Sequence, residues 1–202
     1  MQPRLVIEQK ITAFVNKYKV LNVNEAGDSG QLIALAQQKR LAFKEKVQFF
    51  TDEQKSAVAF TFRAEKIMDV HGRYIVEDTD GTVVGMFRKE FKKSLLVSSW
   101  VLMDADGTEL FRVKESNVTI AVLRRFIGFV PLIGDLLDIA LNFFKYHFSF
   151  TDIQSDQEVG KYEKTTLFRD YYRLSVEDSA WARLDWRVFA AMGVALDALQ
   201  SR

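Results

Sequence analysis

The chain of 202 residues contains no cysteine. This absence excludes structural disulfides, zinc sites built from thiolates, and cysteine nucleophiles. Histidine is scarce as well, since only two are present. Neither His71 nor His147 has a second metal ligand close to it in the sequence. The sequence therefore predicts no metal site and no bound cofactor.

The chain also lacks an excess of charge of either sign. Lys and Arg together number 28 and Asp and Glu 27, which gives a formal net charge of +1. A domain that binds nucleic acid is usually strongly basic, so this balance argues against nucleic acid as a partner. Any charged partner must be bound by a local patch of the surface.

No long apolar run marks the N-terminus. Leu5, Val6 and Ile7 are followed directly by charged and polar residues, whereas a secretory signal needs an apolar stretch of about 7 to 15 residues. We therefore expect a cytoplasmic protein, and peripheral association with a membrane is left open.

Apolar and aromatic residues are abundant. They make up 48% and 13% of the chain, and seventeen residues are Phe. A chain of this length can bury most of the apolar surface that it exposes when unfolded. The composition therefore predicts a Phe-rich core, and because no long linker interrupts the sequence, residues 1–202 are expected to form a single domain.

Two segments share one hairpin pattern. Residues 74–89 and 100–114 each consist of an apolar strand, an Asp-x-Asp-Gly turn and a second strand. Asp and Gly favour the tight turns that join antiparallel strands. Asp78 and Asp80, with their counterparts in the second turn, could suggest calcium ligands, but an EF-hand loop needs further ligands and flanking helices. The pattern therefore predicts hairpins.

Weaker copies of this hairpin occur elsewhere in the chain. Strand-like sequence from Leu5 to Val23 precedes a turn rich in Asn, Asp and Gly, and residues 147–164 form a fourth, degraded copy. Two more strand candidates cover residues 46–52 and 56–64. A meander of this length usually closes into a barrel or folds into a sandwich.

The last stretch, residues 185–200, predicts a helix that is apolar almost all round. Asp185 suits the N-cap, and Asp197 is the only polar side chain between Val188 and Leu199. Twelve residues at about 1.5 Å each span roughly 18 Å, against a bilayer hydrocarbon thickness of about 30 Å. A buried core helix is favoured, and a membrane anchor is the alternative.

A second apolar helix is predicted near residues 131–145, within a helical insertion that covers about residues 126–145. Pro131 suits the first turn, and the polar residues Asp135, Asp138, Asn142 and Lys145 form one narrow stripe. The remaining girth is apolar, so this helix should be buried against the barrel, a partner or a membrane interface.

The order of these elements resembles the LURP-one-related family. The resemblance is carried by the segment from Gly85 to Lys89, the hairpin from Ser98 to Gly107 and the closing helix, and it extends from about Leu5 to the end of the chain. The family is grouped with the phospholipid scramblases and the Tubby C-terminal domains.

The resemblance implies a mainly β fold. It implies a closed antiparallel barrel of about twelve strands around a central hydrophobic C-terminal helix, as in Tubby C-terminal domains. The helix at residues 131–145 is longer and more apolar than the connection expected there.

No catalytic constellation is recognisable. The serines lack the context of a nucleophile elbow, and no Gly-rich phosphate loop precedes a helix. The chain is therefore expected not to be an enzyme.

The main functional signal is cationic. Basic residues beside apolar ones suit an anionic bilayer surface. The structural alternative is that the basic residues form a solvated edge and the phenylalanines are core. The candidate lipid-binding residues are Arg88, Lys89, Lys92, Lys93, Arg124, Arg125, Phe126 and Phe129.

Three functional hypotheses follow. The first is a non-enzymatic Tubby-like module that associates with anionic phospholipid or a membrane surface. The second is a module for protein interaction or self-association that docks through the apolar helix at residues 132–144, within a contact region at 126–144. The third, implied only by the resemblance to scramblases, is lipid scrambling.

Overall fold

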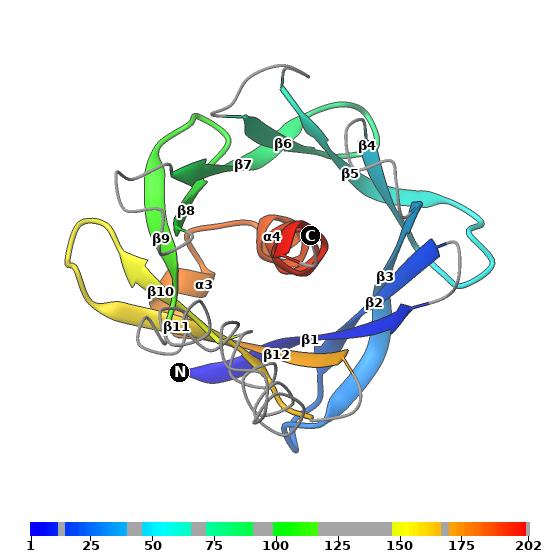
Figure 1. Ribbon diagram of the computed structural model, residues 1–202, viewed down its shortest axis with the longest axis horizontal. Helices are drawn as coiled ribbons and strands as arrows, with labels where there is room; N and C mark the ends of the chain where they lie inside the picture. Colours follow the sequence, from blue (N-terminus) through cyan, green and yellow to red (C-terminus); the bar gives the residue numbers. More distant parts are fainter. Residues whose placement is uncertain are drawn as a thin grey trace, which may run out of the picture.

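A computed structural model describes residues 1–11, 15–39, 46–65, 72–90, 99–116, 147–166 and 170–200. In these residues twelve antiparallel strands surround one helix (Figure 1). The strands are β1 (Gln2–Ile11), β2 (Val15–Val23), β3 (Ser29–Lys39), β4 (Lys46–Phe50), β5 (Val58–Ala64), β6 (Arg73–Glu77), β7 (Val83–Glu90), β8 (Ser99–Met103), β9 (Glu109–Glu115), β10 (Phe148–Asp152), β11 (Glu158–Lys164) and β12 (Asp170–Val176). The helices are α3 (Asp178–Trp181) and α4 (Trp186–Gln200).

The sheet is a closed meander. Each strand pairs with the next in sequence, and β1 pairs with β12 over a register from Gln2 opposite Val176 to Gln9 opposite Asp170. Closure removes the unpaired edges that an open sheet would expose. The expected mainly β barrel of about twelve strands around a C-terminal helix is thereby confirmed.

Hairpin turns form where the Asp and Gly clusters predicted them. Gly81 and Gly107 have φ values of +88° and +84°, a conformation that glycine adopts without a steric penalty. The Asp78 N–H donates to the Thr82 carbonyl at 2.9 Å and the Asp104 N–H to the Thr108 carbonyl at 3.1 Å. Both Asp-x-Asp-Gly segments are thus turns between paired strands.

The strand-like stretch from Leu5 to Val23 is two strands, so the expectation of one continuous strand was wrong. β1 and β2 pair antiparallel from Leu5 opposite Asn22 to Ile11 opposite Asn16. The inward residues include Leu5 and Ile7 in β1 and Tyr18 and Val20 in β2. Residues 12–14, Thr-Ala-Phe, contain none of the usual turn residues, so the sequence does not mark the reversal.

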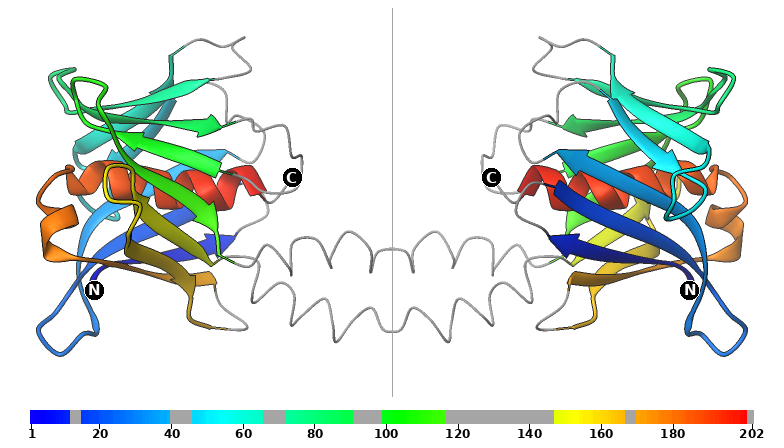
Figure 2. Two further views of the ribbon diagram at one scale, coloured as in Figure 1. Left: turned by 90° about the vertical axis from the view of Figure 1, so that its left-hand side faces the viewer. Right: turned by 90° about the vertical axis from the view of Figure 1, so that its right-hand side faces the viewer.

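The closing helix lies along the barrel axis (Figures 1 and 2). The Asp185 Oδ1 accepts a hydrogen bond from the Arg187 N–H at 2.9 Å, which confirms Asp185 as the N-cap. From Val188 to Leu196 the side chains are 0 to 2% exposed. The helix is therefore a core helix, and the barrel wall encloses it.

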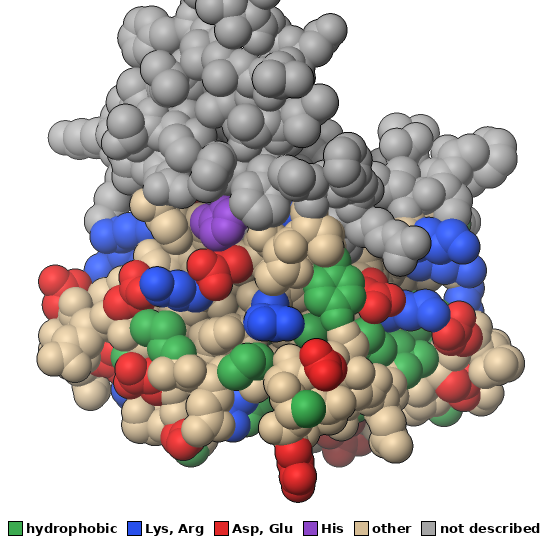
Figure 3. All heavy atoms as spheres, turned by 90° about the horizontal axis from the view of Figure 1, so that it is seen from below, with side chains coloured by type: hydrophobic (Ala, Val, Ile, Leu, Met, Phe, Trp, Pro, Cys, Tyr) green, Lys and Arg blue, Asp and Glu red, His purple; other side chains and the backbone are tan. Residues whose placement is uncertain are grey.

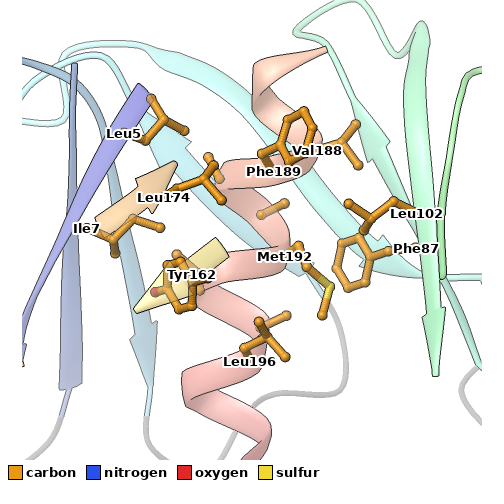
Figure 4. Close-up of a cluster of buried hydrophobic side chains, with 14 of the residues drawn as sticks. Leu5, Ile7, Phe87, Leu102, Tyr162, Leu174, Val188, Phe189, Met192 and Leu196 are labelled. Carbon is orange, nitrogen blue, oxygen red and sulfur yellow. The ribbon is translucent and has the colours of Figure 1, made fainter. Parts of the chain in front are cut away.

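The barrel wall presents large side chains to this helix. Alternate residues of each strand point inward, and Figure 4 shows Ile7, Phe87 and Tyr162 around Met192 of α4. The inward aromatic residues, each at most 2% exposed, are Tyr18, Phe49, Phe60, Phe62, Phe87, Trp100, Phe111, Phe148, Phe150, Tyr162 and Tyr172.

Two glycines let the wall and the helix approach closely. A Cβ added at Gly85 of β7 would lie 2.6 Å from Val188 Cγ2 and 2.9 Å from the Met103 carbonyl oxygen. A Cβ added at Gly193 of α4 would lie 2.5 Å from Ile7 Cδ1. All three distances are too short for real contacts. A side chain at position 85 would have to displace the Met103 backbone, and one at position 193 would have to displace the end of the Ile7 side chain.

Arg187 fixes the start of α4 to the wall. Its Nη1 lies 2.7 Å from the Asp78 carboxylate in the turn between β6 and β7, and its Nη2 lies 2.7 Å from the Asp185 carboxylate. The hydrogen bond from Arg187 lowers the pKa of Asp78, and the bonds to Asp185 and Asp78 raise the pKa of Arg187. The pair therefore stays charged across the ordinary pH range.

The predicted helix at residues 131–145 and the wider insertion at 126–145 lie outside the described residues. The described strands and helices extend from residue 2 to residue 200.

The first prediction concerns the enclosed helix. Val194 is 0% exposed, so Val194→Lys would bury an unpaired charge and should destabilise the fold by about 4 kcal/mol or more. Circular dichroism and urea unfolding would measure the loss. A Val194→Lys protein that keeps the wild-type unfolding midpoint would contradict the central-helix architecture.

The second prediction compares two glycines. Gly85→Ala should cost about 1 to 3 kcal/mol or more through overpacking against Val188. Gly27→Ala is the matched control, because Gly27 also has a positive φ, +84°, but nothing lies within 4 Å of an added Cβ. Backbone strain alone should cost about 1 kcal/mol there. Equal unfolding midpoints for the two variants would show that close packing at Gly85 is unimportant.

Candidate functional site

The strand order separates the connections into two groups. Because neighbouring strands are antiparallel, the odd-numbered strands finish and the even-numbered strands begin at one end of the barrel, where α4 also ends (Figure 2). The hairpin turns that the structure describes lie at the other end, with α3 and the start of α4. We call these the basic end and the turn end, for reasons that follow.

The turn end is acidic. Among the described connections at this end, the basic residues are Lys55 and Arg183. The acidic residues there are Glu25, Asp28, Asp52, Glu53, Asp78, Asp80, Asp104, Asp106, Asp156, Glu177, Asp178 and Asp185.

The opposite end is predominantly basic. Within two residues of the strand ends there, the acidic residues whose side chains are described are Glu65, Glu90, Glu115 and Glu163. The basic residues are Lys10, Lys17, Lys46, Arg63, Arg73, Arg88, Lys89, Lys114 and Lys164. Figure 3 shows one face of this distribution, with several Lys and Arg side chains near the upper margin of the described surface and an acidic side chain at its lowest point.

The adjacent candidates Arg88 and Lys89 point to opposite faces of the barrel wall. Arg88 lies on the outer face, where its Nη2 is 2.5 Å from the Glu109 carboxylate. Lys89 pairs with the inward residue Trp100, and its Nζ lies 5.8 Å from the centre of that ring. The structure therefore does not combine Arg88 and Lys89 in one patch on the wall.

The other candidates, Lys92, Lys93, Arg124, Arg125, Phe126 and Phe129, lie outside the described residues. The strands that flank them are described. The first two belong to the connection between β7 and β8, and the others to the connection between β9 and β10. Both connections begin and finish at strand ends of the basic end.

Charged residues inside this end of the barrel were missed by the sequence analysis. Glu115 of β9 is 7% exposed and Lys164 of β11 is 8% exposed. In β9, Glu115 continues the alternation of the inward residues Phe111 and Val113. In β11, Lys164 lies two residues after the inward residue Tyr162. That alternation was the available signal, and it places both residues on the inner face at the basic end.

A separate cavity of about 330 Å³ lies between the turn from β10 to β11 and α3. Its lining consists of Asp152, Gln154, Ser155, Gln157, Val159, Glu177, Ser179, Ala180 and Arg183. The ionisable side chains of this lining are Asp152, Glu177 and Arg183. In the part of the chain that is described, no three metal-ligating side chains cluster together.

Asp152 is the buried polar centre of this cavity wall. Its Oδ1 accepts hydrogen bonds from the backbone N–H groups of Gln154 and Ser155, both at 2.9 Å, and its Oδ2 pairs with the Arg183 guanidinium. The Ser155 N–H, followed by the Arg183 charge, holds the pKa of the Asp152 carboxyl below its ordinary value despite desolvation. Asp152 thus joins the hairpin to the segment that leads into α4.

Comparison with known proteins gives one match. A family model described as LURP-one-related matches residues 33–197. A search of curated proteins and a search of solved structures found no match. The matched region runs from β3 to the last turn of α4 and so includes most of the barrel.

The third prediction concerns Asp152 and pH. The lowered pKa means that this carboxylate stabilises the fold above the unfolded pKa, about 3.9, and that the contribution is lost as pH falls through the folded value. Asp152→Asn should therefore cost about 1 to 3 kcal/mol at neutral pH and progressively less in acid. Urea unfolding of both proteins from pH 7 to pH 3 would measure this.

Asp156→Asn is the matched control for this experiment. Asp156 lies in the same turn and is exposed, and its φ of 55° is one that Asn tolerates well. It should change stability little at any pH. A difference between Asp152→Asn and wild type that stays constant down to pH 3 would contradict the assigned role of the Asp152 charge.

Proposed function

The chain belongs to the LURP-one-related family, and from this premise we propose that it is a non-enzymatic Tubby-like binding module that associates with anionic phospholipid at a membrane surface. The basic end of the barrel makes the contact. The family match and the barrel fold support the binding module, and the distribution of charge supports the lipid.

The observation that carries the proposal is the segregation of charge along the barrel axis. Basic residues gather at the end where α4 finishes, and acidic residues gather at the turn end, although the net charge of the chain is only +1. Each Lys or Arg near an anionic bilayer contributes about 1 kcal/mol. A nearly neutral protein can therefore bind such a surface through one end.

The candidate residues of the two undescribed connections fit this arrangement. Lys92 and Lys93, with Arg124 and Arg125, would add positive charge at the basic end, to which their connections are attached. Phe126 and Phe129 would add apolar contacts at the headgroup boundary, the combination typical of interfacial binding. These contacts are part of the proposal.

The filled interior favours a surface function over an internal ligand site. Many barrels hold a small ligand inside, between the strands. Here α4 occupies the axis, and its side chains from Val188 to Leu196 are 0 to 2% exposed. This barrel therefore favours binding through its surface over binding of a ligand in its interior.

The two other hypotheses concern residues 126–144 and lipid transport. Docking of a protein partner, or self-association, through the helix at 132–144 falls outside the described residues and stays a prediction, as does lipid scrambling. Among the helices that the structure describes, none combines the length and apolar character needed to cross a bilayer.

The fourth prediction tests lipid association. At low salt the protein should sediment with vesicles that contain phosphatidylserine, and not with vesicles of phosphatidylcholine alone. Lys10→Glu with Lys17→Glu should weaken binding by at least about tenfold, since two contributions of about 1 kcal/mol are lost. Arg124→Glu with Arg125→Glu should act in the same direction.

Lys55→Glu is the control for charge reversal. Lys55 lies in the turn between β4 and β5 at the turn end and is exposed, so its reversal should leave vesicle binding unchanged. Equal sedimentation with neutral and anionic vesicles would refute the proposed function.

A further inference from the structure

We infer that the barrel docks end-on, with its axis steeply inclined to the membrane and its whole basic end facing the lipid. This inference rests on the proposed function and adds the orientation of the protein and the residues that set it. It differs from binding through one side of the wall around β7 to β10, where the sequence analysis placed the candidate site.

Lysines that form no ion pair within the described part of the chain lie on several sides of the barrel at the basic end. Lys10, Lys46 and Lys114 are exposed and Lys17 is half-buried, and none has an ion pair with another described residue. They lie on β1, β4, β9 and β2, respectively. In the barrel order β4 and β9 are separated by four strands on one side and six on the other, so Lys46 and Lys114 lie on nearly opposite sides.

Cations farther from the basic end include several that are matched by carboxylates. Lys19 lies 2.6 Å from Glu53, Arg112 lies 3.2 Å from Glu90, and Lys161 lies 3.3 Å from Glu158. Paired charges exert little net attraction on a distant surface. These paired positions therefore attract an anionic membrane much less than do those lysines of the basic end that have no ion pair with a described side chain.

Two of these lysines face each other across neighbouring strands. Lys10 of β1 lies directly across the strand pair from Lys17 of β2. Like charges in such positions repel and destabilise a sheet. An anionic surface at this end would relieve the repulsion, and it would also attract the inward lysines of the same end, Lys89 and Lys164.

The turn end carries the opposite, negative charge. The acidic turns would be repelled by an anionic bilayer, and the repulsion is smallest when they point away from it. Attraction at the basic end and repulsion at the turn end both favour a barrel axis steeply inclined to the membrane, with the turns far from the lipid.

The absence of cysteine makes the orientation measurable. Single cysteines replace neutral, exposed residues. Ser116 follows β9 at the basic end, Gln48 lies two residues from the start of β4 at that end, and Ala26 and Ala105 lie in turns at the turn end. Each is labelled with a donor fluorophore, and energy transfer is measured to an acceptor-labelled lipid in phosphatidylserine vesicles. The eleven residues of β3 span roughly 35 Å along the strand, and about 27 Å along the axis at the usual tilt of barrel strands, a distance that such transfer resolves.

End-on docking predicts high and similar transfer from Gln48→Cys and Ser116→Cys, and low and similar transfer from Ala26→Cys and Ala105→Cys. Unequal transfer from the two basic-end positions, or high transfer from either turn position, would overturn the orientation while vesicle binding itself persists. Absence of both transfer and sedimentation would overturn the proposed function as well.

Two controls separate the partner and the fold from the orientation. A short DNA duplex at equal phosphate concentration should not displace the protein from vesicles. Displacement by that duplex, together with duplex binding in the absence of vesicles, would identify a nucleic-acid surface and refute the lipid inference. Circular dichroism of each labelled variant should match wild type, since all four positions are exposed.

Discussion

The structure depends on the enclosure of one apolar helix. From Val188 to Leu196 the side chains of α4 are 0 to 2% exposed, and no face of that segment can be turned toward water without exposing apolar surface. A closed barrel wall buries every face of this helix segment. Closure also removes the unpaired strand edges. The close approaches at Gly85 and Gly193 show how tightly wall and helix are fitted.

Enclosure leaves the two ends and the outer wall for interactions with other molecules. Away from the basic end, pairs such as Lys19 with Glu53 neutralise charges of the outer wall. The ends differ because antiparallel closure sends alternate connections to opposite sides. A sequence with nearly equal numbers of acids and bases thus folds into a body that is acidic at one end and basic at the other, and the net charge of +1 hides this arrangement.

Local signals made much of the fold predictable. The Asp-x-Asp-Gly turns and the apolar stretch after Asp185 each determine one element without reference to distant residues. The reversal between β1 and β2 was not predictable, because its sequence contains no turn residue. The candidate site was harder to predict for a different reason. Arg88 and Lys89 are neighbours in sequence, but strand alternation puts them on opposite faces, and the charge of the basic end comes from strands far apart in the chain.

The acidity of the turn end has a structural cause, whereas the like charges of Lys10 and Lys17 disfavour the pairing of their own strands. Aspartates in the turns accept backbone N–H groups: Asp52 from Ser56 at 3.0 Å, Asp80 from Thr82 at 2.9 Å and Asp104 from Thr108 at 2.8 Å. Their negative charge follows from the chemistry of tight turns. At the other end, Lys10 and Lys17 face each other without an ion pair among the described residues and oppose pairing of β1 with β2. The hydrogen bond and positive charge of Lys19, followed by the charges of Lys17 and Lys10, lower the pKa of Glu53, and an external anionic surface would offset the repulsion between Lys10 and Lys17 under the proposed function.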